Sequence, residues 1–235
     1  MNTPLTPQSR PRRSFVYRKL ASLGARYLES NEAAVAASFG GAEEAAAARD
    51  LGLADLSPLR RVGFKGPGAA DWLLSQGVTV PEVNRCAAQA DGARLFRLGA
   101  NDLMITTDLG ATATLPERLS LAWAGLEDPP QSPRGFPMPR QEGFCWFVLS
   151  GRHAAAAMAK ICGVDLRPHK FPVGAIAQTS VARLSAVVAR DDINGTLAYH
   201  LFADSASAEY WWDCILDAMQ EFGGRAVGID ALRSL

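Results

Sequence analysis

Five prolines fall within fourteen residues near the middle of the chain, between positions 127 and 140. They are Pro129, Pro130, Pro133, Pro137 and Pro139. Proline has no backbone N–H and clashes with the preceding helical turn, so this density excludes a helix or an inner strand. The segment predicts a long surface crossover or the boundary between two domains, and we favour the crossover.

Short helices and β-hairpins are predicted on both sides of the crossover, without regular βαβ units. The expected helices are residues 42–51, 67–76, 150–160 and a helix capped by Ser205 or Ser207 that runs to 222. The expected strands are residues 94–98, 102–106, 144–149, 178–190, 197–203 and 226–229. The class is therefore α+β, with antiparallel hairpins and packed helices.

These elements divide the chain into four parts. We expect a basic N-terminal arm and lead-in (1–36), a first α+β half (37–126), the crossover (127–140) and a second α+β half (141–235). Residues 1–13 have no apolar periodicity and are predicted to be a tail.

Charge and cysteine usage exclude several classes of protein. Lys and Arg total 24 and Asp and Glu total 24, so no positive field favours nucleic acid or a membrane surface. No apolar run approaches the roughly 18 residues of a membrane span. The four cysteines have no metal-binding spacing and are expected to be small buried hydrophobes, as is usual in a reducing cytoplasm. We expect a cytoplasmic protein without a metal.

Two features are candidates for docking to a partner. The N-terminus is basic before its first acid, Glu29, and its cations include Arg10, Arg12, Arg13, Arg18 and Lys19. They form either a solvated arm or an arm that binds an acidic partner. Trp211 lies on the apolar stripe of its helix, so the adjacent Trp212 is expected on the neighbouring face, either exposed at an interface or partly covered by a nearby loop.

Motifs for catalysis are absent from the sequence. It contains no Gly-x-Ser-x-Gly elbow and no Walker loop, and residues 63–68 are predicted to be a tight strand-to-helix turn. Asp191 and Asp192 are adjacent, and such neighbours usually diverge into solvent. His200 on a strand is expected to be structural. The sequence therefore predicts no catalytic residue.

Several segments are similar to a known family. Leu-Gly-Leu-Ala-Asp-Leu-Ser-Pro-Leu at 51–59, residues 63–73, the helix at 206–222 and the ending at 223–233 resemble the sarcosine oxidase gamma subunit family. That family belongs to the folate-binding superfamily of the glycine-cleavage T-protein. Arg190 lies where T-proteins carry an Arg-Thr-Gly-Tyr-Thr-Gly-Glu turn. The resemblance implies a T-protein-like folate-binding fold, here without the T-protein C-terminal domain.

Departures from the T-protein pattern imply a loss of catalysis. The turn after Arg190 lacks the glutamate that holds the pterin in T-proteins, and residues 106–108 replace an asparagine-alanine segment. The resemblance therefore implies a non-catalytic gamma-type subunit of a heterotetrameric bacterial sarcosine, or N-methyl amino acid, oxidase linked to tetrahydrofolate one-carbon metabolism. Its partners would be the other oxidase subunits, which carry the flavins and NAD, and this chain would hold no cofactor.

Two alternatives remain open. The first is a stand-alone folate-binding or aminomethyltransferase-like protein, in which tetrahydrofolate would bind through Arg183, Arg190 or His200. The second is a homo-oligomeric scaffold without a ligand.

Overall fold

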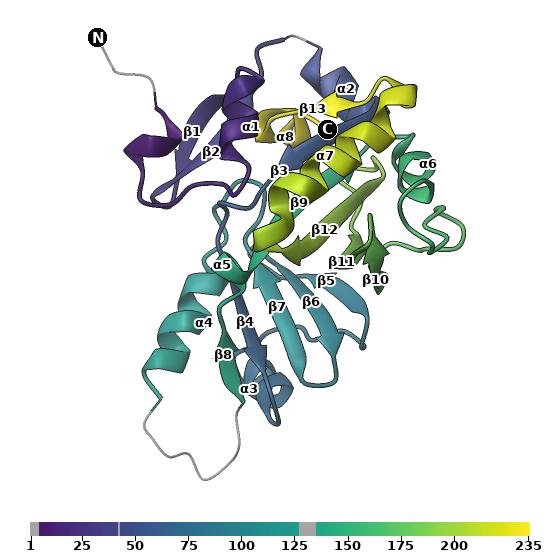
Figure 1. Cartoon of the computed structure of the whole chain (residues 1–235). Helices are drawn as coiled ribbons and strands as arrows, with labels where there is room; N and C mark the ends of the chain where they lie inside the picture. The colour runs from purple at the N-terminus through teal and green to yellow at the C-terminus, as the bar shows by residue number, and fades with distance from the viewer. Residues whose placement is uncertain (1–4, 42, 127–134) are drawn as a thin grey trace.

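The computed structural model describes residues 5–41, 43–126 and 135–235, and it contains two stacked β-sheets flanked by helices (Figure 1). The larger sheet has the strand order β10-β11-β12-β9-β3-β13, and the smaller has the order β5-β6-β7-β4-β8. A separate hairpin, β1-β2, lies near the N-terminus. The predicted α+β class with antiparallel hairpins is confirmed.

The larger sheet is antiparallel except where β13 (Arg225–Ala226) runs parallel to β3 (Gly52–Asp55). Its other strands are β9 (Phe144–Ser150), β10 (Ile176–Val181), β11 (Leu184–Arg190) and β12 (Ala198–Asp204). Because β3 precedes the proline-rich segment and pairs with β9 after it, the two halves of the chain share one sheet.

Both faces of the larger sheet are buried, and successive residues of β9 point to opposite sides. Phe147 packs with the apolar residues of α1 (Tyr17–Ser22), α6 (Ala154–Ala159) and α7 (Ala208–Met219). Trp146 and Val148 instead join a second core with Phe96 and Met104 of the smaller sheet. That core also takes in α2 (Glu44–Leu51) and α8 (Ile229–Arg233).

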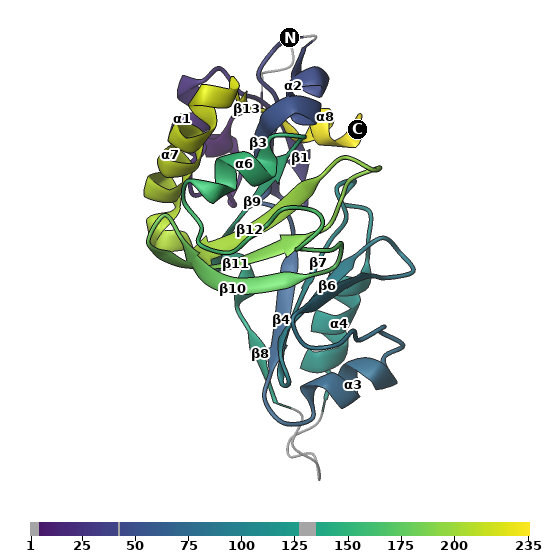
Figure 2. The same cartoon turned by 90° about the vertical axis from the view of Figure 1, so that its right-hand side faces the viewer.

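The smaller sheet contains β4 (Arg61–Lys65), β5 (Arg85–Ala88), β6 (Arg94–Gly99), β7 (Asp102–Thr106) and β8 (Phe136–Met138). Helices α3 (Ala69–Ser75) and α4 (Leu115–Ala124) cover its outer face (Figure 2). Phe64 and Trp72 meet there at 4.8 Å between ring centroids. β8 lies at the sheet edge, where its proline is tolerated, and α5 (Arg140–Gly143) follows. Residues 127–134 of the predicted crossover lie outside the described residues.

The N-terminal segment packs onto the body of the protein, so the prediction of a tail is wrong for residues 5–13. Arg12 forms a bridge with Ala33 of β2 (Ala33–Ser38), which pairs with β1 (Arg26–Ser30). After a 3-10 turn at Pro7–Ser9, Val16 and Leu20 are buried in the main core. Apolar residues just after position 13 therefore hold the basic stretch against the fold.

The predicted strand at 178–190 is two strands, β10 and β11, joined by a tight turn at Ala182 and Arg183. Both turn residues have positive φ, 48° and 67°, as a two-residue hairpin turn of type I′ requires. Neither residue is the glycine or asparagine that usually indicates such a turn, so the sequence pattern did not predict it.

The predicted cap at Ser150 is wrong, because Ser150 ends β9 and donates to the Ala48 carbonyl, and α6 begins four residues later. Ser207 lies at the N-cap position of α7, as one of the two predicted alternatives, but its side chain caps no backbone N–H of the described residues. The Asp204 carboxylate caps the 3-10 turn before α7 and accepts from the Ala206 backbone N–H at 2.8 Å. No helix in the described part of the chain is long and apolar enough to cross a membrane.

Candidate functional site

A cavity of about 390 Å³ opens where the two sheets meet. Its walls come from the start of β6, the end of β7 and the loop after it, the middle of β9 and β12, the β11–β12 turn, and α8. The side chains that matter chemically are Arg94, Thr106, Trp146, Asp191, Asp192 and His200. Strand pairing within each sheet and the stacking of the two sheets bring these residues together from four separate stretches of sequence.

His200 is the histidine of the cavity, and its two ring nitrogens differ in their partners. Trp146 Nε1–H donates to His200 Nδ1 at 3.1 Å, and the two rings stack with centroids 5.7 Å apart. Nδ1 therefore accepts, and the neutral ring carries its hydrogen on Nε2. Nε2 is buried and has no hydrogen-bond partner among the described residues. Burial lowers the pKa of His200 to about 4, so the ring is neutral at physiological pH.

Thr106 supplies a second buried polar atom without a partner at the same cavity. The residue is fully buried, and its Oγ1 has no hydrogen-bond partner in the part of the chain that the structure describes. A buried hydroxyl or N–H without a partner costs about 1–3 kcal/mol. Two such groups lining one cavity indicate a place where a small acceptor-bearing molecule or water fits.

The carboxylates of the cavity already have partners within the chain. Asp191 accepts from Arg94 Nε at 2.6 Å, and Asp192 accepts from Arg190 at 2.9 and 2.7 Å. Asp108 accepts from the backbone of its own loop, including Ala113 at 2.7 Å. Asp191 and Asp192 were expected to diverge into solvent. Instead both are under one-fifth exposed, because β6 and the strand-end guanidiniums lie against their turn.

Arg190 positions the cavity's turn and does not line the cavity. Besides Asp192, its guanidinium donates to the carbonyls of Pro168 and Phe171, at 3.0 and 2.9 Å. The pKa of Arg190 is raised, chiefly by its hydrogen bond to Asp192. Arg183 lies exposed at the β10–β11 turn. Of the three residues predicted for a folate pocket, the structure brings only His200 to the cavity.

Trp146 and Arg94 are the cavity residues that the sequence did not single out. Trp146 lies within an apolar run, where a tryptophan is indistinguishable from core. Arg94 opens a predicted strand of the smaller sheet, and only the stacking of the two sheets places it against Asp191, which follows β11 of the larger sheet. Within the described residues, no group of three His, Cys, Asp or Glu side chains is placed to hold a metal ion.

Among the predicted docking residues, three of the five cations are engaged within the chain. Arg10 pairs with Glu29, Arg12 donates to the Pro58 carbonyl at 2.7 Å, and Lys19 pairs with Asp213 at 2.8 Å. The expected exposure of Trp212 is wrong, because its side chain is fully buried. Its indole packs edge-on against Phe147, in the core between α7 and the larger sheet.

Protonation of His200 makes a prediction about stability. The folded-state pKa, about 4, lies below the ordinary 6.5, so between these values the unfolded chain binds more protons. The contribution of His200 is fully present above about pH 6.5 and is lost as the pH falls towards 4. We expect acidification from pH 7.5 to pH 5 to lower the unfolding free energy by about 2 kcal/mol through the protonation of His200 in the unfolded chain.

Urea denaturation at both pH values measures this effect, with His200→Gln as the comparison. The wild type should lose more stability on acidification than the variant does. Equal losses in the two proteins would mean that His200 is not held neutral by the fold.

Comparisons with known proteins place the chain among T-protein-like folds. The sequence family described as the GCVT N-terminal domain matches residues 95–235. An aminomethyltransferase from Saccharopolyspora erythraea is 23% identical over 245 residues, covering 97% of this chain and 63% of the relative. The chain thus spans less than two thirds of the length of that curated relative.

Two solved structures share the fold. A chain of the heterotetrameric sarcosine oxidase from Corynebacterium sp. U-96, in complex with pyrrole 2-carboxylate, has a TM-score of 0.65 and 22% identity. The superposition covers 91% of this chain and 97% of that chain. Aminomethyltransferase T of the glycine cleavage system from Bartonella henselae has a TM-score of 0.71 and 16% identity, over 94% of this chain and 60% of that chain. The predicted T-protein-like fold is confirmed.

Proposed function

From the premise that the chain belongs to the GCVT N-terminal domain family, we propose that it is a gamma-type subunit of a heterotetrameric sarcosine, or N-methyl amino acid, oxidase and catalyses no step itself. In this proposal the complex works with tetrahydrofolate in one-carbon metabolism, and the flavins and NAD are bound by its partner chains.

The observation that carries the proposal is that the carboxylates of the cavity already accept hydrogen bonds from within the chain. A pterin presents two neighbouring donors, an N–H and an amino group, and a carboxylate without another partner is the natural acceptor for them. Asp108, Asp191 and Asp192 each already accept from a guanidinium or from backbone N–H groups. These residues do not fit a pterin held in the T-protein manner.

Releasing one of these carboxylates for a ligand would be costly. The Arg190–Asp192 pair is mostly buried, with side chains 11% and 18% exposed. Separating such a pair leaves a charge without compensation, at a cost of about 3–5 kcal/mol. Arg190 would also remain tied to the Pro168 and Phe171 carbonyls, so it cannot follow the carboxylate.

A second observation favours the subunit role over a stand-alone enzyme. The fold match extends over 97% of a chain of a heterotetrameric sarcosine oxidase. A shared fold at 22% identity supports an analogous place in a complex and leaves the substrate open.

Co-purification tests the proposal. The full chain, tagged and produced in its own host, should bring down chains that show flavin absorbance and release hydrogen peroxide when sarcosine or another N-methyl amino acid is added. Recovery of the chain alone, as a homo-oligomer, would contradict the proposal and favour a scaffold.

Titration with tetrahydrofolate provides a separate prediction. Calorimetry of the isolated chain should give no binding heat up to about 1 mM ligand, a limit of roughly −4 kcal/mol. The competing function, a stand-alone folate-binding protein, is favoured by the unpartnered His200 Nε2 and Thr106 Oγ1. Micromolar binding that disappears in His200→Ala and persists in Arg183→Ala would establish it instead.

A further inference from the structure

Two arginines of the N-terminal segment have no carboxylate partner in the part of the chain that the structure describes. Arg10, Arg12 and Lys19 are engaged by Glu29, the Pro58 carbonyl and Asp213. Arg13 and Arg18 form no ion pair with a described residue, and both are exposed. The sequence grouped all five cations as docking candidates. The structure divides them into three with a partner in the chain and two without a carboxylate partner among the described residues.

Arg13 and Arg18 converge on one aromatic ring. Their guanidinium carbons lie 5.5 and 5.1 Å from the centroid of Tyr17, the first residue of α1. The ring's electron-rich faces attract the two cations and offset part of their mutual repulsion. A stacked guanidinium keeps its N–H edge free, and that edge binds a carboxylate in a bidentate manner.

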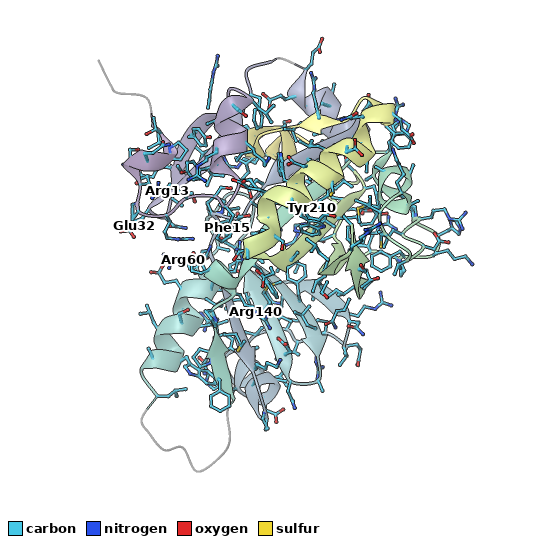
Figure 3. All side chains as sticks on the ribbon, viewed as in Figure 1. Arg13, Phe15, Glu32, Arg60, Arg140 and Tyr210 are labelled. Atoms are coloured by element: carbon cyan, nitrogen blue, oxygen red, sulfur yellow. The ribbon has the colours of Figure 1, made fainter. Side chains whose placement is uncertain are left out.

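The fold holds this Arg13–Tyr17–Arg18 cluster on a fixed support. Val16 and Leu20 are buried in the main core on either side of Tyr17. Lys19 ties α1 to α7 through Asp213 at 2.8 Å. In Figure 3, Arg13 lies above Phe15 on the face turned towards the viewer. A partner would therefore meet preorganised cations and would not need to order a free tail.

The surface beside the cluster is also uncovered. Ala21 and Ser22 on α1 are exposed, and Leu23, which follows the helix, is 49% exposed. Small and apolar side chains next to two cations suit a polypeptide that brings carboxylates together with some apolar contact.

We propose that the Arg13–Tyr17–Arg18 cluster is a docking surface for an acidic segment of a partner polypeptide, rich in Asp and Glu side chains. The identity of that polypeptide as an oxidase subunit rests on the function proposed above. A membrane or nucleic acid is disfavoured because the chain has zero formal net charge and two arginines supply too little attraction for either.

The first experiment uses the isolated full chain and fluorescently labelled poly-L-glutamate as the probe. The double variant Arg13→Glu/Arg18→Glu is compared with Arg85→Glu/Lys170→Glu. Arg85 and Lys170 are exposed and have no carboxylate partner among the described residues. Each double variant replaces two cations by two glutamates, so the net charge changes equally in both. Anisotropy should show binding at low salt that weakens about tenfold in the first variant and little in the second. Equal weakening in both variants would overturn the inference.

The second experiment repeats the co-purification with both variants. Loss of the flavin-containing chains from Arg13→Glu/Arg18→Glu alone, with unchanged circular dichroism, supports docking at the cluster. If the wild type captures no flavin-containing chain, the proposed function fails while the poly-L-glutamate result still stands. If Arg13→Glu/Arg18→Glu still captures the flavin-containing chains, the subunit interface does not include the cluster and the inference is overturned. Binding to phosphatidylserine vesicles that is lost only in Arg13→Glu/Arg18→Glu would reassign the cluster to a membrane surface.

Discussion

Replacing Arg61 with methionine is expected to lower the free energy of unfolding by about 3–5 kcal/mol. The Arg61 side chain is 2% exposed and donates to five backbone carbonyls, those of Ser57, Leu59, Arg140, Gln141 and Phe144. Its guanidinium also lies 5.8 Å from the centroid of the Trp146 ring. Methionine fills similar volume but removes these five hydrogen bonds. The Ser57 and Leu59 carbonyls keep a second donor, Gln141 Nε2 at 3.2 and 3.0 Å, so the main cost falls on the other three carbonyls.

Arg61 matters because its partners come from both sides of the proline-rich segment. Ser57 and Leu59 precede the segment, Arg140 is its last residue, and Gln141 and Phe144 follow it. The side chain therefore joins the start of β4 to α5 and β9 where the two sheets meet. Urea denaturation followed by tryptophan fluorescence measures the loss of stability.

Arg60→Met is the matched control for this prediction. Arg60 is the neighbouring residue, and it pairs with Glu117 at 3.1 Å on the surface, with side chains 32% and 59% exposed. An exposed pair of this kind contributes about 0–1 kcal/mol. If Arg61→Met were as stable as Arg60→Met, the carbonyl network would not hold the halves together.

The second large effect is expected at Trp212, where alanine should cost about 3–5 kcal/mol. The indole is fully buried and packs against Phe147 with centroids 5.2 Å apart and an interplanar angle of 75°. Removing it leaves a cavity between α7 and the larger sheet that the neighbouring side chains cannot fill.

Trp212→Phe separates packing from hydrogen bonding at the same position. Trp212 Nε1 has no hydrogen-bond partner within residues 5–41, 43–126 and 135–235, so phenylalanine loses volume but no hydrogen bond and should cost about 1–2 kcal/mol. Tyr210→Ala, at a 51% exposed position on the same helix, should cost under about 1 kcal/mol. A Trp212→Ala variant as stable as Tyr210→Ala would restore the interpretation of Trp212 as an exposed docking residue.

These two residues illustrate why part of the site escaped prediction. The acceptors of Arg61 are backbone carbonyls, which every residue carries, so nothing in the sequence marks them. Trp212 lies off the main apolar stripe of α7, and periodicity predicts one buried face per helix. Both flanks of α7 are covered because Val16 and Leu20 of the N-terminal segment join the same core as Trp211 and Trp212.

The sequence by itself determined the α+β class, the hairpin at β6–β7, the buried strand β9 and the helices α2, α3 and α7. Each of these depends on local periodicity, on glycine and proline positions, or on turn residues, which act over a few neighbours. The resemblance to T-proteins came from the same contiguous segments. It predicted the fold that the structural comparisons confirm.

Tertiary structure alone decided the chemistry of the cavity and the pairing of the charges. Thr106, Trp146, Asp191 and His200 meet because β7, β9 and β12 belong to two sheets that stack, and no local pattern specifies that approach. The same holds for the basic N-terminal segment, whose cations look alike in sequence. Long-range packing gave Arg10, Arg12 and Lys19 partners and left Arg13 and Arg18 stacked on Tyr17, because a charge is neutralised only by what the fold brings beside it.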